Sequence, residues 1–205
     1  MSKKKLPEMK RFLNLGCGNR IVEPPGPEWI VINHDRRQHR PEVTCVHDLD
    51  TRPWPWADAS IDAIMASAVL EHLKIGLEES MAECWRILKA GGVLTVKIPL
   101  WNTPKAHGDP THRRSVTELT MSYFDPETVA GNAALIYGMP PWELVHREVL
   151  RNPTHRTERI GHELVGLIVS MTGEDHGVTR EAVLERLLAG LEQVLNGIGV
   201  ERTLP

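Results

Sequence analysis

Short apolar runs separated by turns dominate the first half of the chain. In these runs, apolar and often β-branched residues follow one another directly. They lack the alternation of apolar and polar residues that is typical of a strand with one solvent-exposed face. The runs span Phe12–Leu15, Trp29–Asn33, Val43–His47, Ile61–Ala66 and Val93–Ile98. Strands that are buried on both faces of a parallel sheet have this pattern. The sequence therefore predicts five buried, mostly parallel strands.

One clear amphipathic helix is predicted between the last two of these runs. Leu77–Lys89 carries an apolar stripe at helical spacing, formed by Met81, Cys84, Trp85 and Leu88. Gly91 and Gly92 follow it and are expected to end the helix. A strand, a helix and a strand in this order predict a right-handed crossover, and hence an α/β fold.

The C-terminal part adds three further elements. Trp142–Leu150 and Glu163–Ser170 are predicted strands of an antiparallel hairpin at the sheet edge, although Val165–Ser170 also suits a helix. Thr179–Leu195 has the pattern of an amphipathic helix. It packs either on its own domain or on a second subunit of a homodimer. We expect one domain over residues 1–175, with its core in 12–150, and this helix in residues 176–205.

Composition narrows the class of protein. The 205 residues suit about one domain, and 41% hydrophobic with 25% charged residues excludes a disordered chain. A formal charge of −3 gives no electrostatic case for a nucleic-acid partner. No apolar run approaches the roughly 20 residues of a membrane span, and no apolar segment follows the basic start. Three widely spaced cysteines predict no disulfide framework. We therefore expect a cytoplasmic protein that has no membrane partner.

Three predicted strand ends carry candidate binding residues. The first strand ends in the turn Gly16-Cys17-Gly18, the second is followed by Asp35, and the third by Asp48 with Leu49 beside it. Open α/β sheets bind ligands at this edge, where an acidic residue after the second strand suits ribose hydroxyls. A phosphate cradle is disfavoured, because no third glycine follows and Pro24-Pro25 forbids a long helix directly behind the turn.

A series of motifs in this order resembles the class I S-adenosylmethionine-dependent methyltransferases of type 11. The motifs are Leu13-Asn14-Leu15-Gly16-Cys17-Gly18, Asn33-His34-Asp35, His47-Asp48-Leu49, Pro55-Trp56-Ala57-Asp58-Ala59-Ser60-Ile61-Asp62, Val69-Leu70-Glu71-His72 and Arg86-Ile87-Leu88-Lys89-Ala90-Gly91-Gly92. The resemblance covers about residues 12 to 99. It implies a Rossmann-like fold with S-adenosyl-L-methionine as the cofactor.

The same resemblance implies roles for individual residues. Gly16, Cys17 and Gly18 would approach the methionine part of the cofactor, Asp35 the ribose, and Asp48 with Leu49 the adenine. Ser67 and His72 would line the sulfonium side, although a histidine in the place of His72 is more often structural. Two positions depart from the family pattern, which most often has Asp where Asn14 stands and often has glycine where Arg20 stands. Asn14 can still position a water or the cofactor's amino group.

Candidate acceptor-side groups follow the fifth strand, in the segment from His107 to Arg114. His112 or His107 is the expected base or acceptor-orienting group, with Asp109 as its partner. A simple turn, in which the histidine satisfies backbone carbonyls, is the alternative. The spacing of His107, Asp109 and His112 also suits a metal, but no cysteine cluster accompanies it, and we expect none.

The function predicted from these features is methyl transfer to a small-molecule, nucleotide or sugar acceptor. A nucleic-acid methyltransferase is one alternative, although Ala66-Ser67-Ala68-Val69-Leu70 lacks the pattern of enzymes that act on exocyclic base amines. A nicotinamide oxidoreductase is disfavoured, because Tyr123 and Tyr137 have no lysine four residues on. A cofactor-binding module without turnover is the last alternative, distinguished by cofactor binding with no acceptor.

Overall fold

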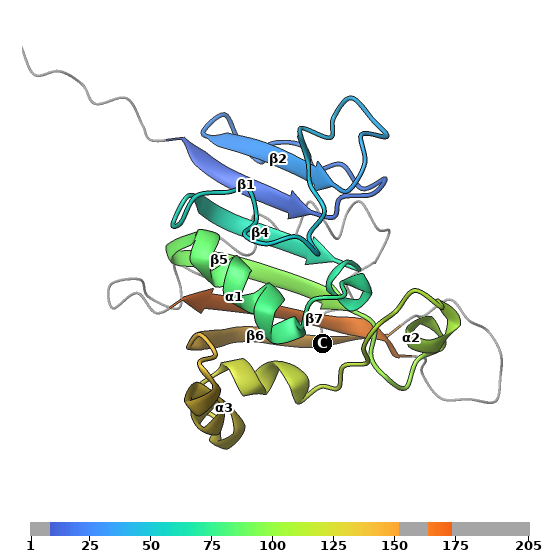
Figure 1. Cartoon of the computed structure of the whole chain (residues 1–205), viewed down its shortest axis with the longest axis vertical. Helices are drawn as coiled ribbons and strands as arrows, with labels where there is room; N and C mark the ends of the chain where they lie inside the picture. The colour runs from blue at the N-terminus through green and yellow to red at the C-terminus, as the bar shows by residue number, and fades with distance from the viewer. Residues whose placement is uncertain (1–8, 152–163, 174–205) are drawn as a thin grey trace, which may run out of the picture.

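The computed structural model describes residues 9–151 and 164–173, which build one seven-stranded sheet with short helices around it (Figure 1). The strands are β1 (Lys10–Leu15), β2 (Trp29–Asp35), β3 (Cys45–Val46), β4 (Ile61–Ser67), β5 (Leu88–Ile98), β6 (Trp142–Arg151) and β7 (Leu164–Gly173). The helices are α1 (Leu77–Ile87), α2 (Pro104–Gly108) and α3 (Val129–Ala134), with 3-10 turns η1 (Leu70–His72), η2 (Thr120–Phe124) and η3 (Leu135–Tyr137).

The sheet has the strand order β3-β2-β1-β4-β5-β7-β6. The first five strands pair in parallel, as the apolar runs predict. The strand β7 runs antiparallel to both of its neighbours, β5 and β6. The chain therefore reverses its strand order beside β1, where β1 pairs with both β2 and β4. Ligands of open α/β sheets bind outside the carboxyl ends of the strands at such a reversal.

The main core lies on the face of the sheet that α1 covers (Figure 1). Leu13 and Leu15 of β1, Ile64 of β4 and Leu94 of β5 are each at most 1% exposed there. Met81 and Cys84 project from α1 into the same cluster and are fully buried. Alternate residues of each strand point to one face, so this spacing of apolar positions fixes which face α1 covers.

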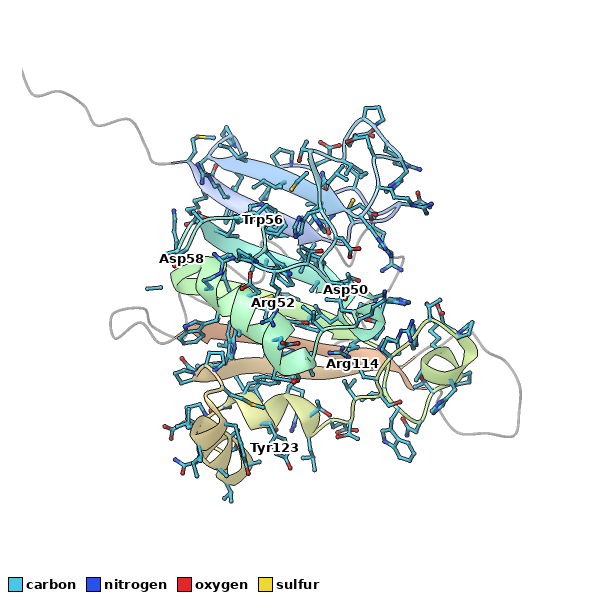
Figure 2. All side chains as sticks on the ribbon, viewed as in Figure 1. Asp50, Arg52, Trp56, Asp58, Arg114 and Tyr123 are labelled. Carbon is cyan, nitrogen blue, oxygen red and sulfur yellow. The ribbon has the colours of Figure 1, made fainter. Side chains whose placement is uncertain are left out.

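Arg86 of α1 holds the segment before β4 against this face. Its guanidinium donates to the carbonyl oxygens of Trp54 (3.1 Å) and Trp56 (2.9 Å), and pairs with Glu83 and Asp58 at 2.7 Å each. Glu83 also accepts the Trp54 amide at 2.7 Å. Figure 2 shows Trp56 and Asp58 on the α1 side of the sheet, as these bonds require.

The boundary between α1 and β5 differs from the sequence expectation. The helix ends at Ile87, and Gly91 and Gly92 lie inside β5 and do not stop the helix. The last helical carbonyls, of Arg86 and Ile87, accept the amides of Ala59 and Ser60 at 2.9 Å each. Leu88 then pairs with Ile61, so strand pairing overrides the helical pattern of the sequence. A register shift separates that pair from Ala63↔Val93.

Two further expectations have mixed outcomes. The third strand is shorter than Val43–His47 and comprises Cys45–Val46 alone. The two C-terminal strands pair antiparallel, and residues 165–170 are a strand and not a helix. Of these two strands, β6 lies at the edge of the sheet, and β7 lies between β6 and β5. The predicted helix Thr179–Leu195 lies outside the described residues. Among the residues that are described, no helix is long and apolar enough to cross a membrane.

Candidate functional site

The glycine turn after β1 is fastened to β2 through its amides. Gly16 N donates to His34 Nδ1 at 3.2 Å, Cys17 N to the His34 carbonyl at 2.7 Å, and Gly18 N to Asp35 Oδ2 at 2.8 Å. Gly16 and Gly18 have φ of 62° and 52°, values that favour glycine. A Cβ on Gly16 would stand 2.4 Å from Cγ2 of Val69, whereas one on Gly18 would meet nothing within 4 Å.

These bonds determine what the turn can offer a ligand. The three amides donate within the protein, so the turn has no N–H at these residues left for a pyrophosphate. Of its carbonyls, that of Cys17 accepts the Arg20 amide at 2.8 Å, and that of Gly18 lies 2.7 Å from His39 Nε2. This leaves the Gly16 carbonyl, and a carbonyl oxygen accepts from a cationic ammonium group. The geometry therefore agrees with the expectation that a phosphate cradle is disfavoured, and it fits the amino group of an amino-acid ligand.

His34 is the side chain that holds this turn, and no sequence motif indicated its role. It is 1% exposed, and its Nε2 bonds to the His47 carbonyl at 3.0 Å. Because Nδ1 accepts from Gly16, the ring must be neutral with its proton on Nε2. Burial, the largest cause, lowers the pKa of His34 and so favours this neutral form. Trp56 packs against the ring edge-to-face at 5.3 Å.

Asn14 supports the loop behind the turn. It is 4% exposed, and its Nδ2 donates to the Arg20 carbonyl (2.7 Å) and to Asn33 Oδ1 (2.8 Å). Asn33 in turn bonds both backbone groups of Val22, at 3.1 and 3.2 Å. The two buried amides therefore fix residues 20–22 over the ends of β1 and β2. This contact with the chain itself accounts for Asn14 without a ligand.

The two predicted acidic groups lie at neighbouring strand ends, in different settings. Asp35 ends β2 and is half-buried, and it accepts from Gly18 as described. Asp48 follows β3 and pairs with the exposed Arg36 at 3.0 Å. Leu49 is buried in the core, and its carbonyl accepts Trp54 Nε1 at 3.0 Å. Cys17, in the glycine turn, has a buried side chain, and this burial raises the pKa of its thiol to about 11.

Cationic side chains gather where β4 and β5 end. Arg20 reaches across from the loop after β1 and donates from Nη1 to Ser67 Oγ at 3.1 Å. Lys97 pairs with Ser67 in the sheet, and its pKa is lowered by burial and then by Arg20 and Lys105. Ser67 thus lies beside Arg20 and Lys97, a setting that suits an anionic ligand group.

The histidines that follow β4 and β5 meet at the same edge of the sheet. The rings of His72 and His112 stand edge-to-face with their centroids 4.6 Å apart. His72 Nδ1 lies 2.8 Å from Thr111 Oγ1, whose hydroxyl donates to Asp109 Oδ1 at 2.6 Å. His112 Nδ1 lies 3.1 Å from the Ala106 carbonyl, and its Nε2 lies 3.8 Å from Asp109 Oδ2.

His112 and Asp109 therefore lie together, as the sequence indicated, and His72 joins them. His107 is exposed on α2. Burial, followed by the neighbouring His112, lowers the pKa of His72.

Glu71 is the member of this cluster that sequence reasoning missed. It is 1% exposed, and neither carboxylate oxygen has a hydrogen-bond partner among the described residues. Burial raises its pKa. Its backbone carbonyl accepts the Arg113 amide at 2.7 Å, which ties η1 to the segment that carries His112. Arg114 donates to the carbonyls of Leu73 and Ile75. Figure 2 shows Arg114 near one end of α1, at the edge of the sheet where the parallel strands end.

Comparison with known proteins agrees with this arrangement. Residues 27–96, from the approach to β2 through most of β5, match a family model described as a methyltransferase domain. No curated protein sequence matches the chain. Many solved structures match its fold.

The chain has the Rossmann-like fold of S-adenosylmethionine-dependent methyltransferases.

Three solved structures illustrate the match. An S-adenosylmethionine-dependent methyltransferase of Archaeoglobus fulgidus is 17% identical, with 80% of this chain and 86% of that one covered at a TM-score of 0.52. The 1,6-didemethyltoxoflavin-N1-methyltransferase of Burkholderia thailandensis, solved with that compound and S-adenosylhomocysteine, is 15% identical over 82% and 72% at 0.51. The (4+2)-cyclase SpnF is 16% identical over 82% and 76% at 0.52.

These likenesses confirm the fold and the family resemblance that the motifs indicate. At such identities they establish the fold alone and leave the acceptor open. The cyclase shares the fold under a different reaction, so the chemistry must be argued from the site itself.

Proposed function

We propose that the protein is an S-adenosylmethionine-dependent methyltransferase that acts on a small-molecule, nucleotide or sugar acceptor. The observation that carries the proposal is the turn Gly16-Cys17-Gly18, whose three amides are bound within the protein and whose Gly16 carbonyl is left for an ammonium group. A dinucleotide with its pyrophosphate would need the opposite polarity.

The other parts of the cofactor have matching groups at the same edge. Asp35 would take the ribose hydroxyls, and Asp48 with Leu49 the adenine. Gly16 and Gly18 would lie along the methionine part of the cofactor. Its carboxylate would pair with Arg20, whose Nη1 donates to Ser67 Oγ. Ser67 and His72 would line the sulfonium side. The bound cofactor supplies the methyl group, and the protein supplies binding and orientation.

The acceptor would lie on the far side of the methyl group, over the ends of β4 and β5. His112 is the proposed base or acceptor-orienting group, with Asp109 beside it. His107, on the exposed α2, is the weaker candidate of the two histidines. The hydrogen bond from His112 Nδ1 to the Ala106 carbonyl supports His112, because it leaves Nε2 of the neutral ring unprotonated, 3.8 Å from Asp109 Oδ2.

The test is a calorimetric titration with S-adenosylhomocysteine, with NAD in parallel. We expect micromolar or tighter binding of S-adenosylhomocysteine, about −8 kcal/mol, and no binding of NAD. Asp35→Asn keeps an oxygen that accepts from Gly18 and removes the charge, and it should weaken binding at least 10-fold. Asp35→Ala, which removes both, should weaken it further.

Glu42→Gln is the matched control, since Glu42 is exposed in the connection from β2 to β3. It should bind as the wild type does. Absence of S-adenosylhomocysteine binding, or equal binding by Asp35→Asn, would contradict the proposal and leave the fold without its expected cofactor.

A further inference from the structure

Hydrogen bonds fix the tautomers of both clustered histidines. The Ala106 carbonyl can only accept, so His112 Nδ1 carries a proton. The Thr111 hydroxyl gives its proton to Asp109, so it accepts from His72 Nδ1, which is therefore protonated as well. In the neutral rings, both Nε2 atoms then hold lone pairs. Two imidazoles arranged in this way are ready to ligate a metal ion.

The partners that fix these tautomers are those that metal-bound histidines have. A ligating histidine donates its other N–H to a carboxylate, a carbonyl or a water, and this bond orients the ring. Here the Ala106 carbonyl serves His112, and Thr111 with Asp109 serves His72. Asp109 also accepts the Thr111 amide at 2.8 Å, so the support is rigid.

Glu71 completes the set with a buried carboxylate that has no other partner. The side chain of Glu71 is 1% exposed, and neither carboxylate oxygen has a hydrogen-bond partner among the described residues. This is unusual, because nearly all buried polar groups form hydrogen bonds. One ligand atom of each of Glu71, His72 and His112 lies within 4.8 Å of the other two. Ligands of a tetrahedral zinc ion stand about 3.4 Å apart, so closure needs shifts of about 1 Å.

We propose that Glu71, His72 and His112 bind a divalent transition-metal ion of the zinc type. Two imidazoles and one carboxylate are borderline ligands that favour zinc over magnesium, which prefers oxygen alone. Three protein ligands leave a coordination position open, as at catalytic rather than structural zinc sites. The nearby Arg114 forms no ion pair with Glu71 among the described residues: its Nη2 donates to the carbonyls of Leu73 and Ile75, and its buried Nη1 has no hydrogen-bond partner there.

The position of the ion suggests a role for it in acceptor selection, a role that rests on the proposed function. The three ligands follow β4 and β5 at the edge where the acceptor would lie. An oxygen atom of the acceptor, from a hydroxyl or a carboxylate, would take the open position. The site would thus orient an oxygen-bearing acceptor, and of the two roles proposed for His112 it would select the acceptor-orienting one.

Metal binding can be measured on the full chain without cofactor or acceptor. Chelator-treated protein is titrated with Zn²⁺, with Co²⁺ as a spectroscopic probe and Mg²⁺ in parallel. We expect one Zn²⁺ bound at micromolar affinity or tighter, with Mg²⁺ at least 100-fold weaker. Glu71→Gln and His112→Gln should each weaken Zn²⁺ binding at least 100-fold and remove the Co²⁺ absorption bands.

Two further variants separate a ligand set from mere packing. Thr111→Val removes the hydroxyl that orients His72 and should weaken Zn²⁺ binding about 10- to 100-fold. Thr111→Ser keeps the hydroxyl and should restore it. His107→Gln, in the same segment but exposed, should bind Zn²⁺ as the wild type does. The thermal midpoint should rise on adding Zn²⁺ to the wild type and stay constant for Glu71→Gln.

Zn²⁺ binding that is no tighter than Mg²⁺ binding, or that survives in both Glu71→Gln and His112→Gln, would overturn the site. If Glu71→Gln fails to fold, His112→Gln and the Thr111 pair decide the question. The outcome is independent of the cofactor, because Asp35→Asn should lose S-adenosylhomocysteine and keep Zn²⁺. A failed metal site and a failed methyltransferase proposal therefore give different results.

Discussion

The two glycines of the turn after β1 should respond very differently to alanine. Both have φ in the left-handed region, which costs an alanine about 1–2 kcal/mol. Only Gly16 also faces a side chain, with a new Cβ at 2.4 Å from Cγ2 and 2.8 Å from Cβ of Val69. Overpacking of this kind costs about 1–3 kcal/mol. Gly16→Ala should thus destabilise the fold by about 2–5 kcal/mol, and Gly18→Ala by about 1–2 kcal/mol.

A double-mutant cycle with Val69→Ala isolates the steric part of this cost. Val69→Ala removes the nearer contact and leaves the Cβ at 2.8 Å, so it should relieve most but not all of the clash. We expect Gly16→Ala and Val69→Ala to be coupled by at least about 1 kcal/mol, with the double variant more stable than additivity predicts. Gly18→Ala and Val69→Ala should add within about 0.5 kcal/mol.

Urea unfolding followed by tryptophan fluorescence measures these differences. Titration with S-adenosylhomocysteine provides a second readout, because the Gly16 amide must also keep its bond to His34. Equal destabilisation by the two glycine variants would refute the reasoning. Additive behaviour of Gly16→Ala and Val69→Ala would refute the steric assignment in particular.

Two further predictions concern buried polar groups that hold loops. The pKa of His34 is lowered in the folded state, so as the pH falls the unfolded chain binds the proton first. The contribution of the neutral ring to stability should therefore be complete above the unfolded pKa of about 6.5 and decrease below it. The urea midpoint of His34→Asn should depend less steeply on pH than that of the wild type. A steeper or unchanged dependence would contradict this. Arg86→Lys keeps the charge but loses the forked bonds to Trp54 and Trp56, which should cost about 1–3 kcal/mol in urea unfolding. The exposed pair of Arg52 with Glu79 supplies the control, since Arg52→Lys should cost less than about 0.5 kcal/mol and an equal loss would argue against the Arg86 network.

The parallel core could be predicted from the sequence because its signals are local. Runs such as Ala63–Ala66 are apolar at consecutive positions, a pattern that favours a strand buried on both faces of a parallel sheet. The end of α1 could not be predicted in this way. The pairing of Leu88 with Ile61 and the bonds from Ala59 and Ser60 to the helix carbonyls are contacts between distant residues, and they end the helix before Gly91.

The candidate site divides along the same line. The turn at Gly16 and the acid at Asp35 stand in motifs whose spacing is local, and they lie together in the structure. Glu71 has no such signal, because a glutamate between Leu70 and His72 is ordinarily a solvated residue. Its backbone carbonyl accepts the amide of Arg113, a residue 42 positions further along the chain and beyond β5, which is a contact that no local pattern predicts. The sequence offers one hint, the place of Glu71 in the motif Val69-Leu70-Glu71-His72.

The place of β7 inside the sheet has a consequence for how the chain folds. Its residues are among the last described, yet Val96 of β5 pairs with Val169, and β6 joins the sheet only through β7. During synthesis, β1 to β5 can therefore assemble while β5 still presents an unpaired edge, which is the kind of edge that recruits other chains. Pairing across such a sequence separation is slow. A chain that ends before residue 164 should keep the parallel half of the sheet, lose the attachment of β6, and aggregate through β5.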